Sequence, residues 1–153
     1  MAAVNAVPGL SLVKSMSSAH LTEADTYWSH TAERLEQSFT TVSAGLAQPG
    51  GSAWHGVAAA SAQERGNADL LTIRTVANQL HDAADIARLG ATRGDASRQQ
   101  VLDAVAAAEQ DDFEVSDNYS VTDLWSGGSE EFQANRKKLA QQHADDMWHK
   151  ASA

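Results

Sequence analysis

The sequence predicts an all-α fold, a helical bundle built on a long antiparallel helical hairpin, and three observations lead to this prediction. The chain has only 2 prolines, and most of its 10 glycines fall in pairs or close together. The long stretches between them are rich in Ala, Leu, Glu, Gln and Arg, which favour helices. Strand-like alternation is confined to one short segment, at about residues 113–122. We therefore expect residues 1–153 to form a single helical domain.

The first helix of the predicted hairpin begins near His20 and ends near Ala47. Its apolar residues recur at heptad-like spacing, which predicts a seam against a second helix. At 1.5 Å per residue the helix spans about 40 Å, too long for a compact chain unless it lies along a helix of similar length. The seam residues predicted on this helix are Leu21, Trp28, Leu35, Phe39 and Val42.

The second helix of the hairpin follows a break at residues 48–51, where Pro49 precedes two glycines. It begins near Ala53 and continues to about Leu89. Its apolar stripe, which includes Leu71, is rich in alanine, so that the two helices can approach closely. A short turn between two long helices is typical of an antiparallel hairpin, which we place at about 20–89.

Two further helices are predicted after the hairpin. We expect a turn at Gly90 and Gly94 and then a third helix over about 96–110. The short extended segment at 113–122 follows. The fourth helix is expected over about 129–150, with Ser129 as its N-cap and two glutamates in its first turn.

Composition excludes several classes of function. Acidic residues outnumber basic ones 20 to 11, for a net charge of −9, so no basic stripe is available for nucleic acid or for an anionic membrane surface. The absence of cysteine excludes disulfides, thiol nucleophiles and thiolate zinc sites. No apolar run approaches the roughly 18 residues of a membrane span. The N-terminal segment has no basic residue before Lys14 and is interrupted at Pro8, which argues against a Sec-type signal peptide.

Motifs for catalysis and cofactor binding are also missing from the sequence. It contains no Gly-x-Ser-x-Gly elbow, no phosphate-binding loop and no Gly-x-Gly-x-x-Gly. A di-iron bundle needs Glu-x-x-His on two helices, and no glutamate here has a histidine three residues later. We therefore expect no catalytic residue, no cofactor and no metal, and a protein that is not an enzyme. An enzyme with a diffuse carboxylate site is the weakest of the alternatives.

The tripeptide Trp54-His55-Gly56 lies at the predicted turn between the two long helices. A wide aromatic side chain there can cover the open end of the seam, and the glycine permits backbone angles that other residues resist. The order of long helix, Trp-x-Gly turn and long helix resembles the WXG family of helical-hairpin proteins, which type VII (ESX) secretion systems of mycobacteria and related bacteria export. A second Trp-x-Gly occurs at 125–127, outside the hairpin.

The wider sequence is similar to N-terminal targeting domains of mycobacterial secreted proteins, some of which precede an enzyme or toxin. The stretches that carry this similarity are PGLSLVKSMSSAHLTEADTYW, AWHGVAAASAQERGNADL, VLDAVAAAE and SVTD. The resemblance implies a type VII secretion substrate or targeting domain, cytoplasmic before export and then secreted or held in the cell envelope. It also implies a homo- or hetero-dimer with another WXG-like hairpin, and recognition by the motor ATPase of the secretion system. No nucleic acid and no membrane insertion are expected.

The family's export motif, Tyr-x-x-x-Asp/Glu, has a candidate match at Tyr119 and Asp123. In the family this motif lies on a helix beside the hairpin, whereas residues 113–122 are predicted to be extended. The alternative interpretation is a structural tyrosine in a loop. A second functional hypothesis also stays open, an intracellular helical adaptor or chaperone-like protein that is not secreted.

Overall fold

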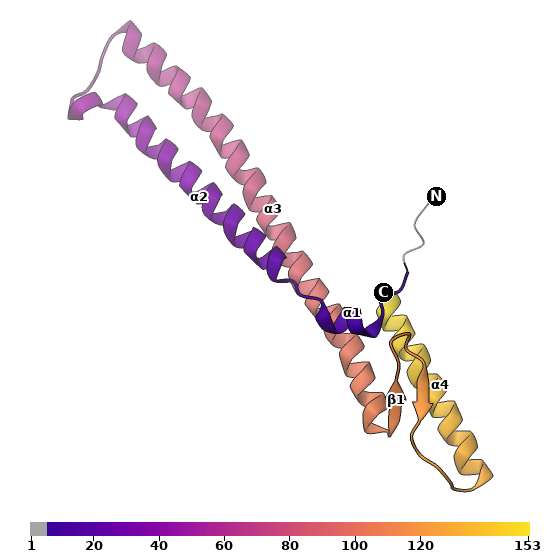
Figure 1. The fold of residues 1–153 in the computed structure, drawn as a ribbon. Coiled ribbons are helices and arrows are strands. Elements are labelled where there is room, and N and C mark those ends of the chain that lie inside the picture. The colour runs from indigo at the N-terminus through magenta and orange to yellow at the C-terminus, as the bar shows by residue number, and fades with distance from the viewer. Residues whose placement is uncertain (1–5) are drawn as a thin grey trace. The chain divides into compact units, whose positions relative to one another are not determined.

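The protein is mostly helical in the computed structural model, which describes residues 6–153 (Figure 1). The first five residues of the N-terminal segment, which bear on the signal-peptide prediction, lie outside the described residues. The all-α fold class is confirmed, with one small sheet added. The elements in chain order are α1 (Leu10–Ser15), α2 (Ala19–Ala47), η1 (Pro49–Gly51), α3 (Val57–Gln110), β1 (Phe113–Val115), β2 (Val121–Asp123) and α4 (Glu130–Ser152).

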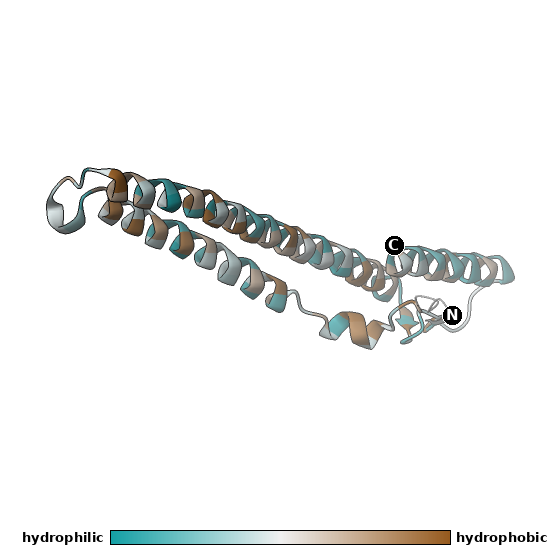
Figure 2. Cartoon of the chain, turned by 90° about the horizontal axis from the view of Figure 1, so that it is seen from above, coloured by the Kyte–Doolittle hydropathy of each residue, from teal (hydrophilic) through white to brown (hydrophobic). Residues whose placement is uncertain are grey.

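The described chain divides into two compact units. Residues 19–91 form one, which we call the rod unit, and residues 6–18 with 92–153 form the other, the sheet unit. In the rod unit, α2 and the first part of α3 lie side by side and run in opposite directions (Figures 1 and 2). The turn between them contains η1 and residues 52–56.

Small side chains fill the contact between the two helices of the rod unit. Gly66 is buried, and a Cβ atom added there would lie 2.7 Å from Cδ1 of Leu46. Because these positions carry little or no side chain, the helix backbones can come close together. The buried apolar residues of this unit are Ala32, Ala59, Ala77, Ala84, Ala87 and Ala91.

Four of the six predicted seam residues lie half-buried on α2, namely Leu21, Trp28, Leu35 and Phe39. The predictions for Val42 and Leu71 are wrong, since Val42 is 54% exposed and Leu71 is 65% exposed. On α2 the half-buried position after Phe39 is Ser43, four residues on instead of three. On α3 the half-buried residue is Leu70, one residue before the predicted Leu71. On α2, a heptad repeat drifts by about 20° per heptad against the 3.6-residue period of a straight helix, so that Val42, three heptads after Leu21, has turned away from the seam.

The predicted turn at Gly90 and Gly94, with a separate helix over 96–110, is also wrong. α3 continues without a break from Val57 to Gln110. Glycine inside a helix costs about 1 kcal/mol relative to alanine, and it lowers the stability of a helix without necessarily ending it. Both glycines also lie near neighbouring side chains: a Cβ would be 3.4 Å from Cδ1 of Leu21 at Gly90, and 3.4 Å from Oγ of Ser18 at Gly94.

The sheet unit contains the extended segment that the sequence predicts. It is an antiparallel hairpin in which Phe113 pairs with Asp123 and Val115 pairs with Val121. The N-cap prediction for α4 is confirmed, because the Ser129 hydroxyl oxygen accepts a hydrogen bond from the backbone N–H of Phe132 at 3.1 Å. The core of this unit consists of Leu10, Val13, Val101, Ala104, Val105, Ala108, Phe113, Tyr119 and Met147.

The hairpin turn of the sheet unit also holds α1, a short helix that the sequence did not predict. The carbonyl oxygen of Asp117 accepts a hydrogen bond from the backbone N–H of Leu10 at 2.9 Å, and its carboxylate accepts one from Ser11 N–H at 2.6 Å. Gly9 passes so close to this carboxylate that a Cβ atom has no room. Asp117 therefore caps α1 from a distant part of the chain.

Candidate functional sites

The Trp-x-Gly tripeptide lies in the turn of the rod unit. Gly56 has a φ of 105° and directly precedes α3, so that this position requires backbone angles that favour glycine. The Trp54 side chain is 40% exposed. It therefore covers part of the turn and still offers an apolar surface to solvent.

An apolar hollow of about 490 Å³ lies beside Trp54. It lies between the end of α2, which contributes Gly45 and Leu46, and the turn, which contributes Pro49, Ser52 and Ala53. None of these six residues carries a charge. The hollow can accept an apolar side chain, and of its six lining residues Ser52 alone has a polar side chain.

Tyr119, the first residue of the candidate export motif, is 2% exposed and has a φ of 64° in the hairpin turn. Its hydroxyl donates a hydrogen bond to the carbonyl oxygen of Pro8 at 2.7 Å, and its ring lies edge-on to Trp148 at a centroid distance of 6.5 Å. Burial raises the pKa of the Tyr119 hydroxyl, and the charge of Asp117 raises it further. Tyr119 thus connects the hairpin turn to the N-terminal segment and to α4.

Asp123, the second residue of the candidate export motif, forms an ion pair with Arg136 of α4. Nε of Arg136 donates to the Asp123 carboxylate at 3.0 Å, and the same guanidinium donates to the carbonyl oxygen of Asp111 at 2.8 Å. The Cζ atom of Arg136 lies 4.0 Å from the centroid of the Phe113 ring. The hydrogen bonds from Arg136 hold the pKa of Asp123 below its usual value, and those to Asp123 raise the pKa of Arg136. Arg136 therefore joins the end of α3, both strands and α4.

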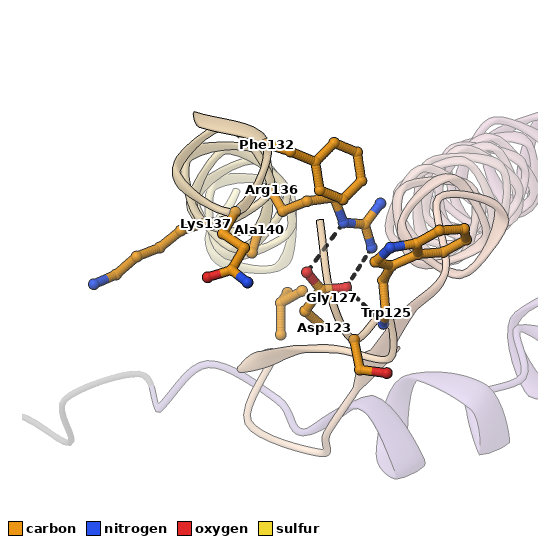
Figure 3. A pocket seen from close by; sticks show the side chains of 10 residues that line it. Asp123, Trp125, Gly127, Phe132, Arg136, Lys137 and Ala140 are labelled. Carbon is orange, nitrogen blue, oxygen red and sulfur yellow. Dashed lines mark hydrogen bonds and ion pairs between the residues drawn. The ribbon is translucent and has the colours of Figure 1, made fainter. Parts of the chain in front are cut away.

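A pocket of about 390 Å³ lies over this ion pair, between β2, the following loop and α4 (Figure 3). Trp125 and Phe132 pack edge to face on one side of it, with ring centroids 6.1 Å apart. Arg136 extends between these two rings toward Asp123, and Lys137 points away from them (Figure 3). Within this pocket, Asp123 and Arg136 are therefore already paired with each other, and Trp125 and Phe132 form one of its sides.

The second Trp-x-Gly, at 125–127, forms part of this pocket and belongs to the loop between β2 and α4. Gly127 and Gly128 both have a φ of 97°. This tripeptide thus also uses a glycine in a left-handed conformation, but it connects a strand to a helix. Position in the fold, and not the tripeptide alone, distinguishes the two occurrences.

Residues 6–153 contain no group of three or more acidic or histidine side chains placed to hold a metal ion. His143 and Asp111 are within 2.8 Å of each other, and His143 also contacts the ring of Phe113. This pair connects the turn after α3 to α4. Within the described range, no helix is both long and apolar enough to cross a bilayer.

Comparison with known proteins finds relatives in mycobacteria. Over 138 residues, 90% of this chain, the sequence is 36% identical to an uncharacterized protein of Mycobacterium bovis and to uncharacterized proteins of two strains of Mycobacterium tuberculosis. The chain spans 42% of the length of these relatives. No protein-family model matches the sequence, and no solved structure matches it.

Sequence reasoning missed the central position of Arg136 in the sheet unit. Only its spacing on α4, four residues after Phe132 and three before Leu139, placed it on the same side of that helix as these apolar residues. Two of its partners are backbone carbonyls, which any residue type provides, so no pattern in the sequence marks them. Asp117 was missed for a similar reason, since it caps a helix more than 100 residues away.

Proposed function

We propose that the chain is a type VII (ESX) secretion substrate, or the N-terminal targeting domain of one, that acts by helix–helix pairing and not as an enzyme. The observation that carries this proposal is the position of Trp54-His55-Gly56. The tripeptide lies in the turn that joins two long helices, with Gly56 in a conformation that favours glycine. This is the arrangement expected of a WXG hairpin.

The exposed side of Trp54 and the uncharged hollow beside it support a role in binding a partner. An aromatic side chain next to an apolar hollow is typical of an anchor point in a protein interface. In this proposal the partner is another WXG-like hairpin, in a homo- or hetero-dimer, and the motor ATPase of the secretion system recognises the pair. The mycobacterial origin of the relatives is consistent with such a system.

For Tyr119 and Asp123 the proposal favours the structural interpretation over the export motif. Both side chains are engaged inside the sheet unit, Tyr119 with Pro8 and Asp123 with Arg136. An export factor reading them would compete with these contacts. Tyr119→Phe keeps the ring but removes the hydroxyl, and Asp123→Asn removes the charge. Secretion of both variants at the level of the unchanged chain supports the structural role, and loss of secretion with an intact fold assigns them to the export signal.

Fractionation of a mycobacterial host tests the proposed function. We expect the tagged chain in the culture filtrate or cell envelope when the type VII system is intact, and only in the cytosol when its motor is inactivated. Cytosolic retention in both strains contradicts the proposal and favours the adaptor or chaperone-like alternative. Trp54→Ala should lower export, whereas the matched change Trp125→Ala, in the other Trp-x-Gly, should not.

A further inference from the structure

The face of α3 that points away from α2 in the rod unit carries a second stripe of exposed residues. Ile86 is 72% exposed and Leu89 48%, in addition to the exposed Leu71. At 100° per residue the members of the stripe fall within an arc of about 60°, roughly opposite the buried alanines of the same helix. We call this set the outer stripe; it consists of Ala68, Leu71, Thr75, Asp82, Ile86 and Leu89.

The spacing of the outer stripe reads the same in both directions. From either end the steps are three and four residues, then seven across the middle, then four and three, with the centre between Asn78 and Gln79. The chemical pattern is nearly symmetric too, because the apolar residues occupy both ends and the polar pair Thr75 and Asp82 occupies the middle. A surface with this symmetry is complementary to a second copy of itself rotated by 180°.

We propose that the outer stripe pairs with the outer stripe of a second copy in an antiparallel arrangement. Leu71 then packs on Ile86 of the second copy, and Ala68 on its Leu89, each contact occurring twice around a two-fold axis near Gln79. Apolar residues at steps of three and four are the spacing by which helices pair in coiled coils. The partner hairpin of the proposed function is then a second copy of this chain, and the outer stripe is the face that binds it. Only the biological role of the pairing rests on the proposed function.

The charges of α3 also favour this partner and this direction. In the antiparallel register Asp82 faces Thr75 of the second copy and lies one residue along from its Arg74. Among residues 6–153 neither Arg74 nor Asp82 takes part in an ion pair. Pairing therefore provides two new Arg74–Asp82 contacts between copies. A parallel register would place Asp82 against Asp82, which is unfavourable.

Charge exchange tests the pairing. Sedimentation of the unchanged chain should give a species of about twice 16.2 kDa. Arg74→Asp or Asp82→Arg alone should weaken the dimer by about tenfold or more, because like charges then meet. The double variant should restore it, since each site again has opposite charges. Val76→Asp, an exposed change on α3 outside the stripe, is the control and should leave the dimer unchanged. A monomeric unchanged chain, or a double variant no better than the singles, overturns the proposal.

Cross-linking tests the direction, and the chain is suited to it because it contains no cysteine. Gln79→Cys lies beside the proposed axis, so a short thiol cross-linker should join two copies. Leu71→Cys alone should not be joined, because the two sites would be about 22 Å apart along the helices. A mixture of Leu71→Cys and Ile86→Cys chains should give the mixed product. Joining of Leu71→Cys to itself without the mixed product indicates a parallel pair and contradicts the inference.

The secretion assay separates this inference from the proposed function. Circular dichroism should show unchanged helix content in the charge variants, so that their effects report on pairing. A dimer that forms as predicted but is retained in the cytosol contradicts the export proposal alone. A chain that is exported by the type VII system while remaining monomeric contradicts the pairing alone.

Discussion

The rod unit and the sheet unit stabilise their helices in different ways. In the rod unit the fully buried side chains are alanines, and large residues such as Ile86 and Leu71 lie in solvent. In the sheet unit the largest fully buried side chains are Phe113 and Met147, and side-chain hydrogen bonds connect distant segments. Buried apolar area provides most of the stabilisation of a fold. Because its buried side chains are larger, the sheet unit obtains more of this stabilisation from its own core. The rod unit leaves more apolar surface exposed to solvent.

The largest effect is expected for Phe113→Ala. The ring is 1% exposed and contacts both Arg136 and His143, so its removal leaves a cavity and takes a packing contact from each of them. We expect the sheet unit to lose about 3–5 kcal/mol of unfolding free energy, measured by urea denaturation. Leu124→Ala, an exposed change in the same unit, should stay within about 0.5 kcal/mol. Equal effects of the two changes would mean that Phe113 is not a core residue.

A larger side chain at a buried alanine should test how closely α2 and α3 approach each other in the rod unit. Ala77 is fully buried between α2 and α3, so Ala77→Leu should cost about 1–3 kcal/mol. Ala58→Leu, an exposed position near the start of α3, serves as the control and should be nearly neutral. Thermal unfolding followed by circular dichroism provides the comparison. A stabilising effect of Ala77→Leu would show that the helices have room between them.

How far the sequence determines these differences depends on the element. The turn at Pro49–Gly51 and the cap at Ser129 could be predicted because each follows from the chemistry of a few neighbouring residues. The short extended segment was predicted from its alternation. These features are local, and the neighbours that decide them lie within a few residues in the chain.

The seam on α3 could not be predicted reliably because this helix has two apolar stripes. Leu71 and Ile86 are larger than the alanines on the opposite face, and hydropathy therefore selected the wrong side. Periodicity gives the period of a stripe but does not identify the face that meets a neighbour. The continuation of α3 through Gly90 could not be predicted either, because Gly90 packs near Leu21, which is far away in the sequence.

A smaller effect is expected for Tyr119→Phe, which removes only the hydrogen bond to the carbonyl oxygen of Pro8. The sheet unit should lose about 0.5–1.5 kcal/mol of unfolding free energy. Tyr27→Phe, at an exposed position on α2, is the control and should change nothing measurable. Indistinguishable stability of the two variants would show that the N-terminal segment does not depend on Tyr119.

The smallest effect is expected from pH, through two exposed carboxylates of the sheet unit. Hydrogen bonds from Ser11 lower the pKa of Asp117, and those from Arg136 lower the pKa of Asp123. The stabilisation is present above the unfolded pKa, near 3.9, and is lost as the pH falls through the lower folded values. Denaturation curves should therefore show a loss of stability in the sheet unit below about pH 4. Asp117→Asn and Asp123→Asn should flatten this dependence, and an unaltered profile would contradict it.

Hydrogen exchange at two protein concentrations tests most directly the claim that the rod unit depends on pairing and the sheet unit on its own core. We predict that amides of residues 68–89 gain protection as the concentration rises, because pairing of the outer stripe suppresses local opening. Amides around Val105 and Phe113 should keep the same protection at both concentrations. If the amides of both units keep the same protection at both protein concentrations, the account is contradicted.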